Sequence, residues 1–305
     1  MKYSSFTALI EERVQERYGK EKNVFRNTII KNNDVELDAL EISSPSEKAT
    51  PTIYLNDFYE DYKQGKSLDS IVETICNIYD NRIPLNDNCT NIFSDFENVK
   101  KNLAFKLVNF EKNEKFLKDV PYIKFLDFAI IFYCLISDKD CNAMAVIHNH
   151  HAKAFGVDEK DLYKIAFENT PKILPYILSP MEEILKKLLI INSGPEEDPD
   201  FTFDKLFGTK KSGMYVLSNT KNFNGSAVML YKDVLKDIAT ALGNVDLYII
   251  PSSVHELIIL PDLGTMDKKA LTAMVRDVNA SEVAESEILS DHAYFYNHEE
   301  GKLYA

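Results

Sequence analysis

Apolar and polar residues alternate in short blocks through residues 212–262, where the local pattern predicts structure most clearly. Apolar runs lie at Met214–Leu217, Ala227–Tyr231, Leu247–Ile250 and Leu257–Leu260. Runs of this length between turn-forming residues are typical of strands. An amphipathic stretch lies between the second and third runs, so the segment predicts the order strand–strand–helix–strand–strand. That order indicates an α+β fold.

The N-terminal half combines strand-like runs with one strongly periodic helix. Val24–Ile30 and Val35–Ile42 flank the polar sequence Lys31–Asp34, which predicts a hairpin. Apolar residues recur at helical spacing through Leu68–Tyr79, and Ser67 precedes them as an N-cap. We therefore expect strands and helices to be mixed in this half as well.

The most apolar part of the chain lies near its middle. Pro121–Ile136 is followed by the polar sequence Ser137–Asp140 and by a further run, Asn142–Ile147. These runs predict two strands joined by a turn, and the first should be central because it is apolar on both faces. Further helices are expected at Asp158–Asn169, Met181–Ile191 and Asp267–Val278. Short polar turns between neighbouring strands favour mainly antiparallel or mixed sheets.

A length of 305 residues suits two domains. Residues 192–200 contain two prolines, a glycine and four carboxylates, a composition that resists packing. We predict an N-terminal α+β domain at 1–193, a linker at 194–199 and a C-terminal α+β domain at 200–305. Each domain should hold a mainly antiparallel or mixed sheet with packed helices.

The charge of the chain argues against nucleic acid as a partner. Its net charge is −13, from 48 acidic and 35 basic residues, and such a field repels phosphate backbones. The densest basic cluster, Lys205, Lys210 and Lys211, is interpreted as a solvated loop.

Hydropathy argues against a membrane protein. The longest apolar run, Phe125–Ile136, contains Asp127 and is shorter than the ~20 residues of a spanning helix. The first residues begin an amphipathic pattern and lack the continuous apolar core of a signal peptide. Cys76 and Cys134 lie in apolar surroundings and are expected to be free thiols. We expect a cytoplasmic protein of a prokaryote-like cell and leave its oligomeric state open.

Aromatic and acidic residues are dense at residues 54–62, where Tyr54, Asp57, Tyr59 and Tyr62 form a candidate binding surface. Tyrosine offers an apolar ring with a polar tip, and acidic neighbours favour a cationic or hydroxylated partner. Burial of the same aromatics at the start of a helix is the alternative interpretation.

Two further groups of residues could carry chemistry. His148 and His150 would share one face if the strand before them continued, which could offer two imidazoles to a metal. Ser252, His255 and Glu256 lie close in sequence and suggest a nucleophile and base, but without the G-x-S-x-G turn. The alternatives are polar residues that lead into a helix in the first case, and a hairpin turn at Pro251–Ser253 in the second.

Several phrases resemble a bacterial family of unknown function, domain of unknown function 5688. The phrases are Pro51–Tyr59 with Tyr62 and Gly65, Phe155–Val157 with Glu168–Pro171, Tyr215–Asn219 with Asn224–Gly225, and Leu247–Glu256. The C-terminal part more distantly resembles a second such family, number 1444. Neither resemblance implies an established activity, cofactor or catalytic residue.

The sequence therefore favours a non-enzymatic intracellular binding or regulatory protein without a cofactor, which recognises a protein or a small polar ligand. One alternative is a metal-assisted or His/Glu-based hydrolase that uses His148, His150, His255 and Glu256. Another is a structural component of a phage-related or mobile-element assembly.

Overall fold

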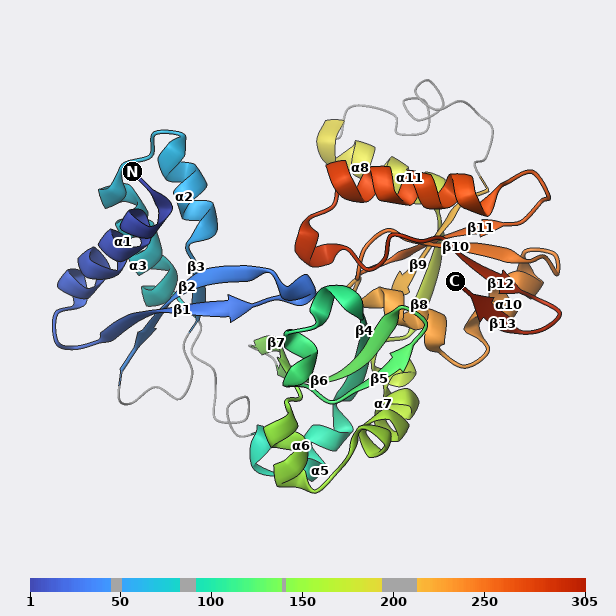
Figure 1. Ribbon diagram of the computed structural model, residues 1–305, viewed down its shortest axis with the longest axis horizontal. Coiled ribbons are helices and arrows are strands. Elements are labelled where there is room, and N and C mark those ends of the chain that lie inside the picture. Colours follow the sequence, from blue (N-terminus) through green and yellow to red (C-terminus); the bar gives the residue numbers. More distant parts are fainter. Residues whose placement is uncertain (45–50, 83–91, 139–140, 194–212) are drawn as a thin grey trace.

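The computed structural model describes residues 1–44, 51–82, 92–138, 141–193 and 213–305. Within these ranges the chain forms helices and three antiparallel sheets, which confirms the α+β prediction. Figure 1 shows the first sheet and its helices at one end of the molecule, while the other two sheets lie together. Residues 1–44 and 51–82 are termed the N-terminal lobe, and the remaining described residues are termed the body.

The N-terminal lobe is a three-stranded sheet covered by helices on one face. Its elements are α1 (Tyr3–Tyr18), β1 (Asn23–Ile30), the 3-10 helix η1 (Asn32–Asp34), β2 (Glu36–Ser43), β3 (Thr52–Tyr54), α2 (Asn56–Lys63) and α3 (Leu68–Asp80). The strand order is β1-β2-β3. Phe6 and Ile10 of α1 and Ile75 of α3 are buried against Leu40 and Ile42 of β2. The lobe thus has a core of its own.

Both local predictions for this lobe are confirmed. The hairpin pairs Val24 with Ile42 and Ile30 with Glu36, with η1 as its turn. The Ser67 hydroxyl accepts a hydrogen bond from the Ser70 N–H and caps α3, as expected of serine at this position.

The middle of the chain forms a four-stranded sheet with β6 at its centre. The elements are η2 (Ile92–Ser94), α5 (Phe96–Lys101), β4 (Leu103–Asn109), η3 (Glu111–Asn113), η4 (Phe116–Lys118), β5 (Tyr122–Phe125), β6 (Phe128–Asp138), β7 (Cys141–Val146), α6 (Asn149–Phe155) and α7 (Glu159–Ile173). β6 pairs with β4, β5 and β7, which confirms the expected central strand.

The apolar stretch Pro121–Ile136 is not one strand, which corrects the prediction. It divides at Leu126, whose φ of 53° reverses the chain, and β5 then pairs with the first residues of β6. The next residue, Asp127, accepts hydrogen bonds from the Ser290 and Tyr294 hydroxyls. The break therefore directs a carboxylate toward polar partners in the C-terminal part of the body.

The third sheet has six strands in the order β13-β12-β10-β11-β9-β8. Its elements are β8 (Tyr176–Pro180), α8 (Met181–Ser193), β9 (Tyr215–Asn219), η5 (Gly225–Leu230), α10 (Val234–Ala241), β10 (Leu247–Pro251), β11 (Leu257–Pro261), α11 (Lys268–Ser281), η6 (Glu285–Glu287), β12 (Tyr294–Asn297) and β13 (Lys302–Tyr304). The run Ala227–Tyr231 was expected to be a strand, but most of it belongs to the 3-10 helix η5.

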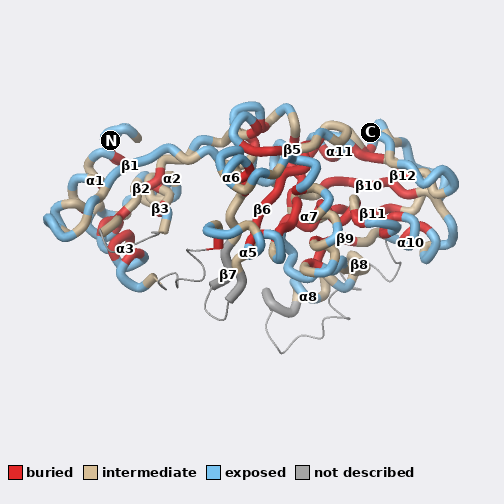
Figure 2. Tube along the Cα trace, turned by 90° about the horizontal axis from the view of Figure 1, so that it is seen from below, coloured by how far each residue is buried: buried red, intermediate tan, exposed pale blue. Residues whose placement is uncertain are grey.

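One apolar core joins the second and third sheets. Phe105, Phe128 and Phe132 from the second sheet belong to the same buried cluster as Leu217 and Ile249 from the third. Figure 2 shows the buried positions concentrated along β6, β10 and β11. The predicted linker, residues 194–199, lies outside the described residues, so the domain boundary there stays a prediction. β8 precedes that segment and β9 follows it, and the two strands pair in one sheet.

Two expectations from composition concern burial and membrane insertion. Cys76 and Cys134 are buried free thiols, as expected. In the part of the chain that the structure describes, no helix has the length and apolar content needed to cross a membrane.

Candidate functional site

The N-terminal lobe meets the body at the tip of the β1–β2 hairpin (Figure 1). Asn33 has a φ of 61° there, and its N–H donates to Asn113 Oδ1 over 2.8 Å. The Asn113 amide donates back to Asn33 Oδ1 over 2.9 Å, and the Asn33 amide donates to the carbonyls of Glu285 and Ile288. Asn33 and Asn113 are both buried, and this pair is termed the asparagine latch.

Neighbouring groups reinforce the latch. The Asp34 carboxylate accepts from the backbone N–H groups of Lys115 and Phe116, and the Lys115 amine lies 2.6 Å from Glu36 Oε1. The carboxylates on this side of the hairpin are therefore engaged with the body.

The predicted binding residues Tyr59 and Tyr62 lie close together and face α1. Their rings lie 5.2 and 5.5 Å from the Phe6 ring, between centroids, and the Tyr59 hydroxyl donates to the Met1 carbonyl. Both side chains are half-buried. These contacts hold α2 against α1.

The other two predicted binding residues lie apart from this pair. Ile53 is buried in the lobe core, so the next residue, Tyr54, projects from the opposite face of the sheet. The Lys31 amine lies 4.3 Å from the centroid of the Tyr54 ring. Asp57 is exposed in the first turn of α2. The four residues therefore do not form one surface.

The outer edge of β1 is half closed and half open. β1 is an edge strand, and its residues 24, 26, 28 and 30 direct their backbone N–H groups away from β2. Side chains of α1 close the first half, because Gln15 accepts from the Val24 N–H and Glu11 accepts from the Arg26 N–H. Among the described residues, nothing accepts from the N–H groups of Thr28 and Ile30. Both residues are exposed.

The histidine group begins a helix and does not extend a strand, which corrects the geometry assumed for a metal site. β7 ends at Val146 and α6 begins at Asn149. His148 Nδ1 lies 2.8 Å from Asp119 Oδ2, and the His148 N–H donates to His151 Nδ1. Burial and the neighbouring imidazoles lower the pKa of His151. This arrangement matches the alternative interpretation, in which polar residues lead into a helix.

His255 and Glu256 belong to the β10–β11 hairpin. The N–H groups of Ser252 and Ser253 donate to the Glu256 carbonyl, which confirms the turn. His255 Nδ1 accepts from the Asn224 N–H, and its Nε2 lies 3.9 Å from Glu287 Oε1. The Ser252 hydroxyl donates to Glu256 rather than to the imidazole. The Ser253 hydroxyl accepts from the His255 backbone N–H, and within the described ranges no serine hydroxyl is hydrogen-bonded to the His255 imidazole.

The two histidine groups have separate surroundings. His148 contacts Asp119, His150 and His151, whereas His255 contacts Phe223, Asn224 and Glu287. No group of three potential metal ligands gathers in the described part of the chain.

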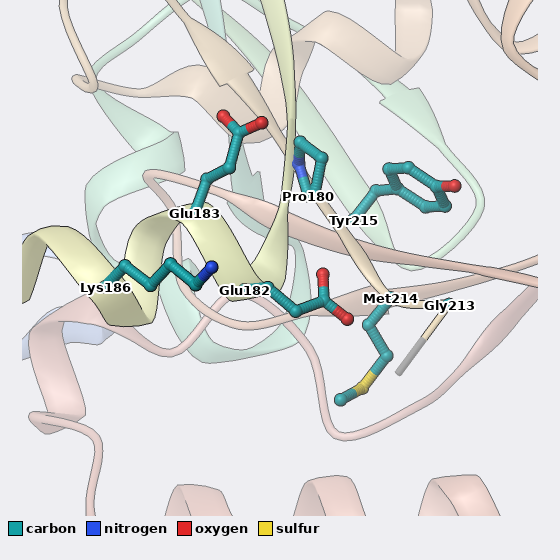
Figure 3. Close-up of a pocket in the computed structure, with 7 residues that line it drawn as sticks. All are labelled: Pro180, Glu182, Glu183, Lys186, Gly213, Met214 and Tyr215. Atoms are coloured by element: carbon teal, nitrogen blue, oxygen red, sulfur yellow. The ribbon is translucent and has the colours of Figure 1, made fainter. Parts of the chain in front are cut away.

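A pocket of about 250 Å³ lies where α8 begins beside β9, and it contains none of these residues. Figure 3 shows that α8 supplies its charged side chains and β9 its tyrosine. The lining residues are Pro180, Glu182, Glu183, Lys186, Gly213, Met214 and Tyr215. Its volume is below the ~300–1,000 Å³ typical of sites for drug-sized ligands.

Sequence reasoning missed the latch and the open edge. The four-residue turn at Lys31–Asp34 was recognised, but the partners of Asn33 lie 80 and more residues away. The closed half of β1 depends on Glu11 and Gln15, which are four residues apart on one face of α1. The sequence shows that spacing, but it does not show that β1 lies beside this face of α1.

A family model described as Family of unknown function (DUF5688) matches residues 3–298. No curated protein and no solved structure gave a significant match.

Proposed function

The chain belongs to the family of unknown function DUF5688, and we propose that it is a non-enzymatic binding or regulatory protein that takes up an extended segment of a partner protein. The observation that carries this proposal is the open half of the β1 edge, at Thr28 and Ile30. An edge strand with free backbone donors and acceptors is a template for an added strand.

The side chains around this edge support the same role. Phe25 is 42% exposed and Ile30 is 38% exposed, and they lie on opposite faces of β1. Ile30 lies in the open half of the edge, where a side chain of an added strand would lie beside it, whereas Phe25 lies in the closed half. Apolar contact with Ile30 would then supplement the main-chain hydrogen bonds.

The closed half of the edge limits where a partner can pair. The Glu11 carboxylate accepts from the Arg26 N–H and lies 2.6 Å from Arg26 Nε. The outward N–H of Arg26 therefore already has an acceptor. A partner strand is therefore directed to residues 27–30. In this proposal Tyr59 and Tyr62 act indirectly, since they fix the helix that carries Glu11 and Gln15.

The proposal includes further expectations from the sequence. It places the protein in the cytoplasm of a bacterium, with no nucleic-acid partner. It also keeps the distant resemblance of the C-terminal part to family 1444 as a hypothesis.

The test uses a phage-displayed library of random peptides and two variants of one residue. Thr28→Pro removes the outward N–H but no bond to β2, a placement that edge strands tolerate. Thr28→Ala keeps the N–H and removes the hydroxyl, with its hydrogen bond to Asp38, and the γ-methyl group. Peptides selected on the wild-type protein should bind Thr28→Ala equally and lose at least about tenfold in affinity for Thr28→Pro.

Hydrogen exchange locates the contact. The amides of Thr28 and Ile30 should gain protection when a selected peptide binds, while those of Val24 and Arg26 should change little. Peptides that bind Thr28→Pro as well as the wild type, without protection of Thr28 and Ile30, would contradict the proposal.

A further inference from the structure

Helix α8 lies at the margin of the body. It directly follows β8, which is an edge strand of the third sheet among the described residues. In Figure 2 the helices α8 and α11 lie far apart, with β8, β9, β10 and β11 between them. Tyr176, the first residue of β8, is 41% exposed. This margin therefore exposes an aromatic side chain even before α8 begins.

α8 is packed less closely than the other long helices of the body. None of residues 181–189 is buried, and none belongs to an apolar cluster of the described residues. By contrast, α7 buries Leu162 and Ala166 in the core that joins the second and third sheets. α11 buries Leu271 and Val275 against the third sheet. The described part of the chain therefore covers the apolar side chains of α8 only in part.

The apolar side chains of α8 lie on one face of the helix. Their positions follow the i, i+3, i+4 and i+7 spacing of a packing face. We term these residues the α8 face: Met181, Ile184, Leu185 and Leu188. Leu188 is 50% exposed, and the other three are half-buried. Glu183 and Lys186 project from the other side of the helix and line the pocket beside β9 (Figure 3). The α8 face is therefore turned away from that pocket.

The charges of α8 are complementary to those of a second copy of the same helix. Glu182 and Glu183 precede the middle of the α8 face, and Lys186 and Lys187 follow it. When two such helices pack antiparallel, the acidic half of each lies against the basic half of the other, whereas a parallel pair brings like charges together. A two-fold axis perpendicular to the helix produces the antiparallel arrangement. The order of charges therefore favours a second copy of this chain as the partner.

We propose that the protein forms a two-fold symmetric dimer in which the α8 faces of two copies pack antiparallel. This packing brings Ile184 and Leu185 of both copies to the axis and buries each Leu188 beside Met181 of the other copy. The glutamates and lysines then surround an apolar centre, which is the usual arrangement of a protein interface. The α8 face belongs to the body and the β1 edge to the N-terminal lobe, so this proposal is independent of the proposed function.

The first experiment measures the oligomeric state of the full chain by sedimentation equilibrium at about 1–100 µM, where the wild type should dimerise. Leu188→Glu places a carboxylate in the apolar contact and should raise the dissociation constant at least about tenfold. Met274→Glu is the matched control, because Met274 on α11 is 49% exposed and Leu188 is 50% exposed. This control should dimerise as the wild type does. Thermal melting establishes that each variant is folded.

The second experiment tests the charge pattern. One variant carries Glu182→Lys and Glu183→Lys, and the other carries Lys186→Glu and Lys187→Glu. Each variant alone presents like charges to its own copy, so its dissociation constant should rise at least about tenfold. Mixed in equal amounts, the two variants present opposite charges to each other and should form a heterodimer. The wild-type order of charges also stabilises α8 as a single helix, but that role gives no recovery on mixing.

Three results would each overturn the proposal. The first is a wild type that remains monomeric at about 100 µM, which would assign the α8 face to a different occupant. The second is a folded Leu188→Glu variant that dimerises as the wild type does. The third is a mixture of the two charge variants that forms no heterodimer.

Discussion

The two junctions in this molecule are built from different interactions. The second and third sheets share one apolar core, to which Phe105, Phe132 and Ile249 contribute. The N-terminal lobe is held by the asparagine latch and its neighbours, which are polar groups on a hairpin tip. Apolar burial contributes about 1.5–3 kcal/mol for each large side chain, whereas a hydrogen bond contributes about 0.5–1.5 kcal/mol net.

We infer from this difference that one junction stabilises the body and the other orients the lobe. A large shared core makes the two sheets of the body one cooperative unit. A few directional hydrogen bonds fix the orientation of the lobe but contribute little to its attachment. We therefore expect the lobe to open at a lower free energy than the body.

The largest effect is expected from the shared core. Phe132 is fully buried in β6, and Phe132→Ala should lower the free energy of unfolding by about 3–5 kcal/mol. Because the core is shared, hydrogen exchange should show β6 and β10 losing protection together. Phe223→Ala, at a ring that is 36% exposed, is the control and should cost far less. Loss of protection in β6 alone would argue against a common core.

An intermediate effect is expected at the latch. Asn113→Ala leaves the N–H and the side-chain oxygen of Asn33 buried without a partner, which should cost about 2–3 kcal/mol. The amides of η1 and β1 should exchange faster while those of β6 keep their protection. The control Asn77→Ala removes an exposed amide from α3. Equal exchange in the two variants would mean that the latch does not hold the lobe.

The smallest effect is expected at Lys106, and it has the opposite sign. The pKa of Lys106 is about 8 in the folded protein, below its ordinary value of about 10.5, so folding disfavours the charged form. The resulting penalty is fully present below pH 8 and disappears as pH rises toward 10.5.

Lys106→Met should therefore stabilise the protein by about 1–2 kcal/mol at pH 7. Chemical denaturation across pH 7–10 should show the wild type gaining stability relative to this variant. Parallel pH profiles for the two proteins would refute a desolvated amine at this position.

Sequence patterns predicted elements wherever the signal was local. Three features that depend on neighbouring residues were predicted correctly: the hairpin at Val24–Ile42, the cap at Ser67 and the central strand β6. Hydrophobic periodicity also predicted the ends of α3, α7 and α11 to within a few residues.

The errors arose where distant contacts decide the conformation. The apolar pattern of Ala227–Tyr231 does not distinguish a buried strand from a buried helical segment. This run follows Gly225, where a Cβ atom would lie 2.4 Å from the His255 carbonyl oxygen, so the chain passes too close to that turn for any other residue. The break at Leu126 precedes Asp127, which accepts a hydrogen bond from Tyr294, 167 residues away.

The candidate sites were harder to predict than the fold. Tyr54, Asp57, Tyr59 and Tyr62 were predicted as one binding surface, but the packing of Tyr59 and Tyr62 against α1 could not be inferred from the sequence. The open edge at Thr28 and the surroundings of Lys106 depend on which elements meet in space. A lysine inside the apolar run Leu103–Val108 was the one visible signal for Lys106.

The hydrogen bond from Asn33 to the Glu285 carbonyl joins residues 252 positions apart, which has a consequence for biosynthesis. At about 5–20 residues per second, a ribosome needs roughly 10–50 s to make the intervening chain. The lobe contains its own core, so it can fold during this interval, before the last part of its docking surface, Glu285 and Ile288, exists. Throughout that time the Asn33 amide of the nascent polypeptide lacks its two carbonyl acceptors, and docking completes only after translation has passed residue 288.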